Sequence, residues 1–200
     1  MCEWEALERR RGQTTPVLRL SPRDIHIWRI DLPGSVQARA YVHPRRLEIL
    51  AAYAGDAGDL HASTSYTDGI ALFAVARRAI GVDVELQREV TGADAIARSY
   101  FAGTEYARWR REQSPSTQFL CYWTRKEAYL KALGLGFEHP PQNVDASCDT
   151  RAGAIFNATD AFESLRWTVF SFQPCCGYTA ALAHAREPGI CFRWLRAVSP

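Results

Sequence analysis

Three acidic residues and one lysine have the types and spacing that can do chemistry in this chain of 200 residues. Residues 80–86 alternate apolar and acidic side chains, so a strand places Asp83 and Glu85 on one face with their α-carbons about 7 Å apart. Two such carboxylates repel each other unless a cation lies between them. Together with Glu127 they would form a three-carboxylate oxygen site. Such a site suits Mg²⁺, because this ion takes few protein ligands and keeps room for water and phosphate.

A helix must supply the third carboxylate. Apolar residues recur close to the spacing of one helical face, and a glycine follows that is well placed to end the helix: Phe119, Leu120, Trp123, Leu130, Leu133 and Gly134. Glu127 and Lys131 are four residues apart, so they share a face about 6 Å apart along the axis. The alternative is an exposed ion pair, worth only about 0.2–0.5 kcal/mol. The acidic strand upstream favours the site instead.

The two motifs together resemble those of the 4′-phosphopantetheinyl transferases. I-G-V-D-V-E is followed, with Glu127 44 positions after Asp83, by W-T-R-K-E-A-Y-L-K. The family pattern is G-[VI]-D-x-E, a gap of about forty residues, and [WF]-[ST]-x-K-E-[AS]-x-x-K, and every fixed position is filled here. The resemblance is to the larger, single-chain type that activates surfactin synthetase. Either motif alone would be weak, whereas both at this spacing are specific.

This resemblance implies an activity and a role for each site residue. The family moves the phosphopantetheine arm of coenzyme A to a serine of a carrier protein and releases 3′,5′-ADP. It serves fatty-acid, polyketide and non-ribosomal peptide synthesis. Asp83, Glu85 and Glu127 would then hold Mg²⁺, with Mn²⁺ as an alternative ion. Glu127 would take the serine proton. Lys131 would neutralise charge on the phosphate and touch coenzyme A.

The resemblance is weaker where coenzyme A binds. The family segment N-x-S-H-[ST], whose histidine contacts a phosphate, corresponds to His61-Ala62-Ser63-Thr64-Ser65, with Thr64 in the place of that histidine. The expected phosphate-contacting residues are Ser63, Thr64, His61, Arg45 and Arg46. The alternative for the two arginines is that they are solvated charges at the start of a helix. The N-terminal lobe is also shorter than is usual in the family.

Carrier proteins are acidic, so a basic and aromatic surface is expected to bind one. We expect such a docking face to comprise Arg98, Tyr100, Phe101, Arg108, Arg110 and Arg111. In the alternative interpretation, the aromatic residues are core and the arginines are solvated.

Composition is that of a globular protein, and no global feature indicates a nucleic-acid-binding protein or a membrane protein. The formal net charge is only +2, and no apolar run approaches the length of about 20 residues that a membrane span needs. The six cysteines lack metal-binding spacing, so free thiols and a cytoplasmic location are expected. A monomer is also expected. A non-catalytic relative that binds a carrier protein or a nucleotide, and more remotely a Mg²⁺-dependent nuclease, are the competing functions.

The chain is expected to be α+β, with two similar lobes related by a pseudo-twofold axis. Residues 1–79 would form the shortened lobe on the coenzyme A side, and residues 80–200 the lobe with the metal site and the docking face. Before the acidic strand we expect a loose arm or short helix at 1–16, a strand at 25–32, a helix at 45–54 and a strand at 69–77. After it we expect helices at 91–101 and 104–112, and strands at 154–157, 165–172 and 177–185.

Overall fold

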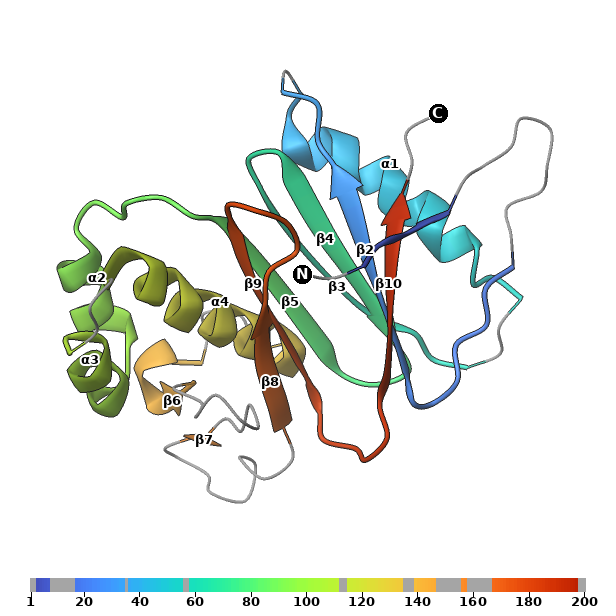
Figure 1. The fold of residues 1–200 in the computed structure, drawn as a ribbon. Coiled ribbons are helices and arrows are strands. Elements are labelled where there is room, and N and C mark those ends of the chain that lie inside the picture. The colour runs from blue at the N-terminus through green and yellow to red at the C-terminus, as the bar shows by residue number, and fades with distance from the viewer. Residues whose placement is uncertain are drawn as a thin grey trace.

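The two larger β-sheets pack against each other and carry helices on their outer faces (Figure 1). The computed structural model describes residues 3–7, 17–34, 36–55, 58–111, 115–134, 139–146, 156–157 and 167–197. The expected α+β class is confirmed, whereas the pseudo-twofold relation of two lobes stays a prediction. No helix in the described ranges combines the length and the apolar character that crossing a membrane would need.

The first sheet has five strands in the order β1-β10-β2-β4-β3. Its strands are β1 (Glu5–Leu7), β10 (Cys191–Ala197), β2 (Asp24–Asp31), β4 (Ile70–Ala76) and β3 (His61–Thr67). β10 runs parallel to both of its neighbours, and the other pairs are antiparallel. Helix α1 (Ala38–Ala51) packs on the outer face through Val42 and Ile49, which join a core with Trp28 and Phe73. The last strand of the chain therefore belongs to the sheet that the N-terminal half builds.

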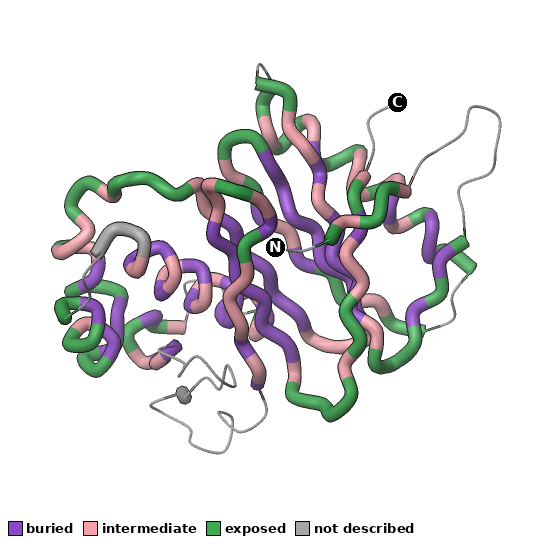
Figure 2. Tube along the Cα trace, viewed as in Figure 1, coloured by how far each residue is buried: buried purple, intermediate pink, exposed green. Residues whose placement is uncertain are grey.

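The second sheet has three antiparallel strands, β5 (Ile80–Leu86), β9 (Tyr178–Ala185) and β8 (Trp167–Phe172). Because side chains alternate along β5, its apolar residues Ile80, Val82 and Val84 face the first sheet and join the core between the sheets. The opposite face of β5 meets α4 (Pro115–Leu133), which also packs on β9. Buried residues therefore run through the strands at the centre of the molecule (Figure 2).

Among the described residues, three short helical elements lie around α4. Helices α2 (Ala93–Tyr100) and α3 (Gly103–Trp109) pack on the first half of α4 through an aromatic cluster. A 3₁₀ turn at Pro141–Asn143 leads into β6 (Val144–Asp145), which pairs with β7 (Phe156–Asn157).

The strands expected at 25–32, 69–77, 80–86, 165–172 and 177–185 and the three helices after β5 are confirmed. Helix α1 begins at Ala38 and contains Pro44, so the start at residue 45 that was predicted for this helix was wrong. The exposed Pro44 is tolerated there, although its ring removes one helical hydrogen bond. Residues 5–7 form β1, not the expected arm or helix, because β10 offers an edge to pair with. Of the strand expected at 154–157, the described part is β7.

Candidate active site between β5 and α4

Asp83 is the buried centre of the candidate site, with its side chain only 6% exposed. Its Oδ1 atom accepts hydrogen bonds from the Ser65 hydroxyl and from the Lys131 ammonium, both at 2.7 Å. Its Oδ2 atom is buried without a hydrogen-bond partner. Burial raises the pKa of Asp83, while Lys131 and Ser65 counteract that rise. A buried carboxylate oxygen without a partner is costly, so this atom marks a place where a cation would be favourable.

Glu85 and Glu127 belong to the same electrostatic environment. Burial raises the pKa of Glu85, and the negative charges of Asp83 and Glu127 raise it further. Burial likewise raises the pKa of Glu127, again with help from the charge of Asp83, while Lys131 lowers it. The strand and the helix therefore bring the three carboxylates close enough for their charges to act on one another.

The three carboxylates do not already form a closed ligand group. Within the described ranges, no three His, Cys, Asp or Glu side chains are clustered in a way that could hold a metal ion. The Lys131 ammonium forms an ion pair with Asp83 Oδ1 and also lies 3.4 Å from the Val82 carbonyl oxygen. The donor chemistry nevertheless fits a hard divalent cation, because the site offers carboxylate oxygens, one of them buried and unpaired.

Gly81 allows helix α4 to lie this close to the acidic strand. A Cβ atom at this position would lie 1.9 Å from the carbonyl oxygen of Ala128 and 2.6 Å from the amide nitrogen of Ala132. Both atoms belong to the backbone of α4, which cannot move aside as a flexible side chain would. The glycine of the I-G-V-D-V-E motif therefore sets the distance at which Lys131 can reach Asp83.

Lys126, the residue before Glu127 in the second motif, is buried and structural. Its ammonium is 2% exposed and forms an ion pair at 2.7 Å with Glu105 of α3, which is completely buried. It also donates to the carbonyls of Pro141 and Val144, which ties α4 to the loop that contains the 3₁₀ turn and β6. Glu105 in turn accepts hydrogen bonds from the amides of Ala102 and Ala146. Lys126 and Glu105 thus join α3, α4 and this loop next to Glu127, although neither side chain belongs to the acidic group.

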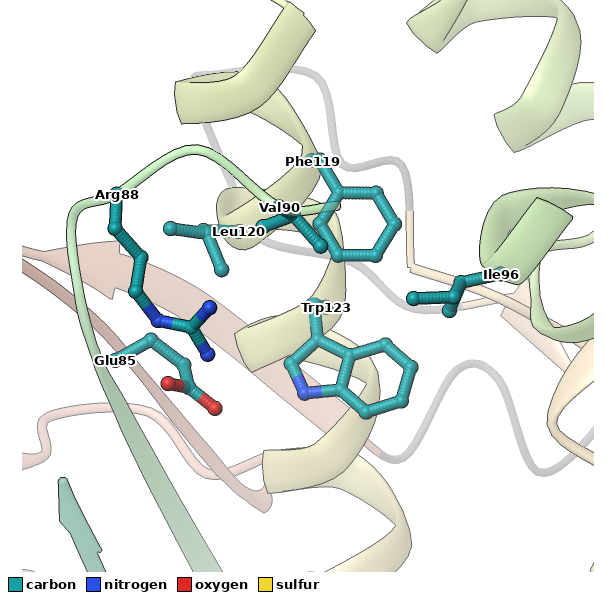
Figure 3. Close-up of a pocket in the computed structure, with 7 residues that line it drawn as sticks. All are labelled: Glu85, Arg88, Val90, Ile96, Phe119, Leu120 and Trp123. Carbon is teal, nitrogen blue, oxygen red and sulfur yellow. The ribbon is translucent and has the colours of Figure 1, made fainter. Parts of the chain in front are cut away.

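A pocket of about 180 Å³ opens beside Glu85, between the end of β5, α2 and α4. Its lining is mainly apolar: Val90, Ile96, Phe119, Leu120 and Trp123. Figure 3 shows the Arg88 guanidinium facing the Glu85 carboxylate on one side, and the rings of Phe119 and Trp123 on the other. Glu85 therefore borders a small apolar pocket, with the positive charge of Arg88 beside it.

Two of the expected coenzyme A contacts lie together on the other side of β3. Thr64 pairs with Phe73 across the β3–β4 ladder, and the Arg46 guanidinium lies 5.2 Å from the centre of the Phe73 ring. The Thr64 hydroxyl oxygen and the Arg46 Nε atom are both buried and without hydrogen-bond partners. Two polar atoms that lack partners beside one ring could receive a phosphate group.

The other expected coenzyme A contacts are arranged differently. The Ser63 hydroxyl is buried and accepts a hydrogen bond from the Val82 amide at 3.1 Å, so it joins β3 to β5 instead of facing solvent. Arg45 pairs with Glu48 at 3.3 Å and lies over the Tyr41 ring. His61 is exposed at the start of β3.

The expected docking face is only partly at the surface. Phe101 is 3% exposed and packs against Trp109, Phe119 and Tyr122, so its assignment to that face was wrong because it belongs to the aromatic core. Tyr100 is exposed and contacts Trp123 edge to face. Arg98, Arg108, Arg110 and Arg111 are exposed on α2, on α3 and just beyond α3, and two of them, Arg98 and Arg110, approach Asp94.

Comparisons with known proteins agree with the motifs. A 4′-phosphopantetheinyl transferase of Nostoc sp., HetI, is 40% identical over 124 residues, which are 60% of this chain and 50% of that protein. The 4′-phosphopantetheinyl transferase gsp of Aneurinibacillus migulanus is 32% identical over 85 residues, which are 41% of this chain and 35% of that protein. A phosphopantetheinyl transferase of Thraustochytrium sp. is 24% identical over 172 residues, which are 79% of this chain and 54% of that protein.

The chain spans about half or less of the length of these relatives. The sequence model of the 4′-phosphopantetheinyl transferase superfamily matches residues 79–183, just over half of the chain. This span runs from the residue before β5 almost to the end of β9, and it contains Asp83, Glu85, Glu127 and Lys131. With both the acidic strand and the lysine-bearing helix inside the matched span, the chain belongs to the 4′-phosphopantetheinyl transferase superfamily.

Proposed function

We propose that this chain transfers the 4′-phosphopantetheine arm of coenzyme A to a serine of an acyl or peptidyl carrier protein, as an enzyme of the larger single-chain type. The proposal is supported by the presence of Asp83, Glu85, Glu127 and Lys131, whose charges act on one another, inside the span that matches the superfamily. In the reaction the serine oxygen forms a bond to the phosphorus that bears pantetheine. The bond from that phosphorus to the bridging oxygen breaks, and 3′,5′-ADP leaves.

The three carboxylates would hold Mg²⁺, with Asp83 Oδ2 as the buried ligand. To share the ion, Glu85 and Glu127 must turn toward Asp83, which their partly exposed positions permit. When bound, the ion would withdraw charge from the phosphoryl oxygens and help the leaving group depart.

Glu127 is the residue best suited to take the serine proton. Burial and the charge of Asp83 raise its pKa, which makes it a stronger base than an ordinary carboxylate once it is ionised. It is only partly buried, so a serine from another protein can approach it. Lys131, one helical turn further on, would neutralise the charge that develops on the phosphate.

For coenzyme A, the unpaired polar atoms of Arg46 and Thr64 support a phosphate contact beside Phe73. Arginine suits phosphate because its planar fork can donate two hydrogen bonds at once. Thr64 brings one hydroxyl but no charge, so we expect weaker coenzyme A binding than in relatives with a histidine there. Calorimetric titration of coenzyme A into Thr64→His tests this, and affinity no higher than that of the natural sequence would refute it.

We propose that the carrier protein docks over α2 and α3, where Arg98, Arg108, Arg110 and Arg111 would attract an acidic partner. The apolar pocket beside Glu85 reaches α2 through Ile96, and together with exposed Tyr100 of α2 it would seat an apolar side chain. Changing Arg108, Arg110 and Arg111 together to glutamate should raise the KM for the carrier protein steeply without changing the coenzyme A affinity. An unchanged KM would exclude this face.

The decisive experiment is incubation of the full chain with Mg²⁺, coenzyme A and an apo carrier protein, followed by mass spectrometry of the carrier. The expected result is a mass gain of one phosphopantetheine, which Glu127→Gln should abolish. Glu187→Gln removes a glutamate that pairs with Arg78, far along the chain from the acidic group, and should leave the transfer intact. An unmodified carrier that nevertheless binds the chain would identify a non-catalytic binding protein instead.

A further inference from the structure

We propose that Ser65 is a positioning residue that turns Asp83 so that its Oδ2 atom is the oxygen presented to the metal ion. This inference rests on the metal site of the proposed function and assigns the ligand oxygen within it. The Ser65 hydroxyl and the Lys131 ammonium both contact Oδ1 at 2.7 Å, and Oδ2 is buried with no hydrogen-bond partner. All donors within reach of Asp83 among the described side chains thus lie on one of its two oxygens.

Two donors on one oxygen fix the rotation of the carboxylate. The Ser65 hydroxyl comes from β3, on the first sheet, whereas Lys131 comes from α4, on the outer face of the second. They therefore hold Oδ1 from two different elements. Rotating the carboxylate away from this orientation would break both hydrogen bonds inside a buried environment, where a lost bond is costly. The free oxygen consequently keeps one direction before any ion arrives.

The position of Ser65 follows from how the two sheets meet. β3 is the edge of the first sheet and β5 the edge of the second, and between them side-chain hydroxyls take the place of backbone ladder bonds. Ser63 accepts from the Val82 amide at 3.1 Å, and Thr67 accepts from the Leu86 amide at 3.4 Å. Ser65 is the member of this hydroxyl seam (Ser63, Ser65 and Thr67) that contacts the Asp83 carboxylate instead of a backbone amide.

Ser63 is a matched control for Ser65. Both are serines on β3, both are 8% exposed, and both contact β5. Replacing either with alanine removes one hydroxyl of the seam, but only the change at Ser65 removes one of the two side-chain donors to the carboxylate. A purely structural role of the seam would make the two variants alike.

Lys131 provides a second contrast, because it is charged. Its ammonium pairs with Asp83 Oδ1, whereas the ion is assigned to Asp83 Oδ2. Lys131 therefore compensates part of the negative charge that would attract the metal. Loss of the neutral Ser65 hydroxyl should therefore weaken metal binding. Loss of the Lys131 charge should strengthen it as long as coenzyme A is absent.

The test is calorimetric titration of Mg²⁺ into the full chain without coenzyme A, so that no catalytic step is involved. Ser65→Ala should weaken Mg²⁺ binding by about 10- to 100-fold, as for other residues that orient a metal ligand. Ser63→Ala should keep the Mg²⁺ affinity within about threefold of the natural sequence. Ser65→Thr retains the hydroxyl, so it should bind Mg²⁺ much more tightly than Ser65→Ala does. Lys131→Met should bind Mg²⁺ about tenfold more tightly, because a competing positive charge is gone.

Equal losses in Ser63→Ala and Ser65→Ala, or no loss in Ser65→Ala, would overturn the proposal, as would a natural chain that does not bind Mg²⁺. If Ser65→Ala does not fold by circular dichroism, Ser65→Cys replaces it, because a thiol of similar size donates only weakly. The transferase proposal fails separately. A chain that binds Mg²⁺ with this pattern of affinities but leaves an apo carrier protein unmodified would retain the role of Ser65 and lose the transfer.

Discussion

Gly81→Ala is the substitution whose effect the structure defines most sharply. The added Cβ would lie 1.9 Å from the Ala128 carbonyl oxygen, whereas ordinary contacts begin at 3.4 Å. To restore such a contact, α4 must move away from β5 by about 1.5 Å, because the obstacle is the helix backbone itself. The helix would carry Glu127 and Lys131 with it.

The cost has two parts. Overpacking of a close-packed interface costs about 1–3 kcal/mol, and more where neither partner can yield. In addition, α4 contributes Ala128, Tyr129 and Leu130 to a buried cluster with the second sheet, which would loosen as the helix withdraws. We expect a loss of at least about 3 kcal/mol in the free energy of unfolding, which is a large share of the stability of a typical domain.

Urea unfolding followed by circular dichroism measures this loss, and Gly103→Ala serves as the control. Gly103 begins α3, and a Cβ there would meet no atom within 4 Å, so its replacement should change stability by no more than about 0.5 kcal/mol. Calorimetry of the folded fraction of Gly81→Ala should also show weaker Mg²⁺ binding. If Gly81→Ala unfolds at the same urea concentration as Gly103→Ala, the close approach of α4 to β5 is not what this structure indicates.

Three further results are expected. Lys126→Met should lower the free energy of unfolding by about 3–5 kcal/mol because it leaves the charge of Glu105 buried and unpaired, and adding Glu105→Leu should recover much of that loss in the same urea titration. Burial lowers the pKa of His26 from its usual 6.5 to about 4, so between these values the unfolded chain binds a proton that the fold excludes. The contribution of His26 to stability should thus fall by about 2 kcal/mol as the pH drops from 7 to 5, and the difference in pH dependence between the natural sequence and His26→Gln measures it. Because the site carboxyls have raised pKa values, Mg²⁺ should raise the melting temperature more at pH 8 than at pH 5, and equal shifts would contradict the metal site.

The acidic strand and the lysine-bearing helix could be predicted because their signals are local. β5 alternates apolar and acidic residues with period two, and its apolar side faces the core between the sheets. The helix repeats apolar residues at helical spacing around Glu127 and Lys131. Each pattern lies within a single strand or helix, so it can be recognised locally. The family pattern then indicated that the strand and the helix contribute to one site.

The strands that sequence analysis missed lack such a signal. β3 reads His-Ala-Ser-Thr-Ser-Tyr-Thr, and the side that meets β5 consists of hydroxyl residues, so its alternation is not one of apolar against polar. β10 pairs in parallel with β2, from the opposite end of the chain. A parallel partner so distant in sequence leaves no turn signature between the two strands. The hydroxyl seam was therefore invisible from the sequence.

The role of Lys126 was missed for a related reason. Its neighbours along the helix face other directions, and its partner Glu105 lies on another helix. One signal was available, since Glu105 stands three residues after Ala102 at the start of α3, where a glutamate often binds the free amides of a helix. That signal predicts that Glu105 caps α3, but it does not predict that Lys126 pairs with the same carboxylate.

The balance of charge around Asp83 separates this site from an ordinary buried ion pair. Lys126 and Glu105 are matched one to one, and every polar atom of the Glu105 carboxylate has a partner. Burial raises the pKa of Glu105 as well, but Lys126 and both amides lower it. At Glu85 and Glu127 the charge of Asp83 adds to the rise in pKa that burial causes, so repulsion between carboxylates opposes their ionisation at neutral pH. In a structural network each carboxylate would have its own positive partner. A bound divalent ion would instead attract all three carboxylates and so outweigh their repulsion. The excess negative charge is thus better explained by binding than by stability.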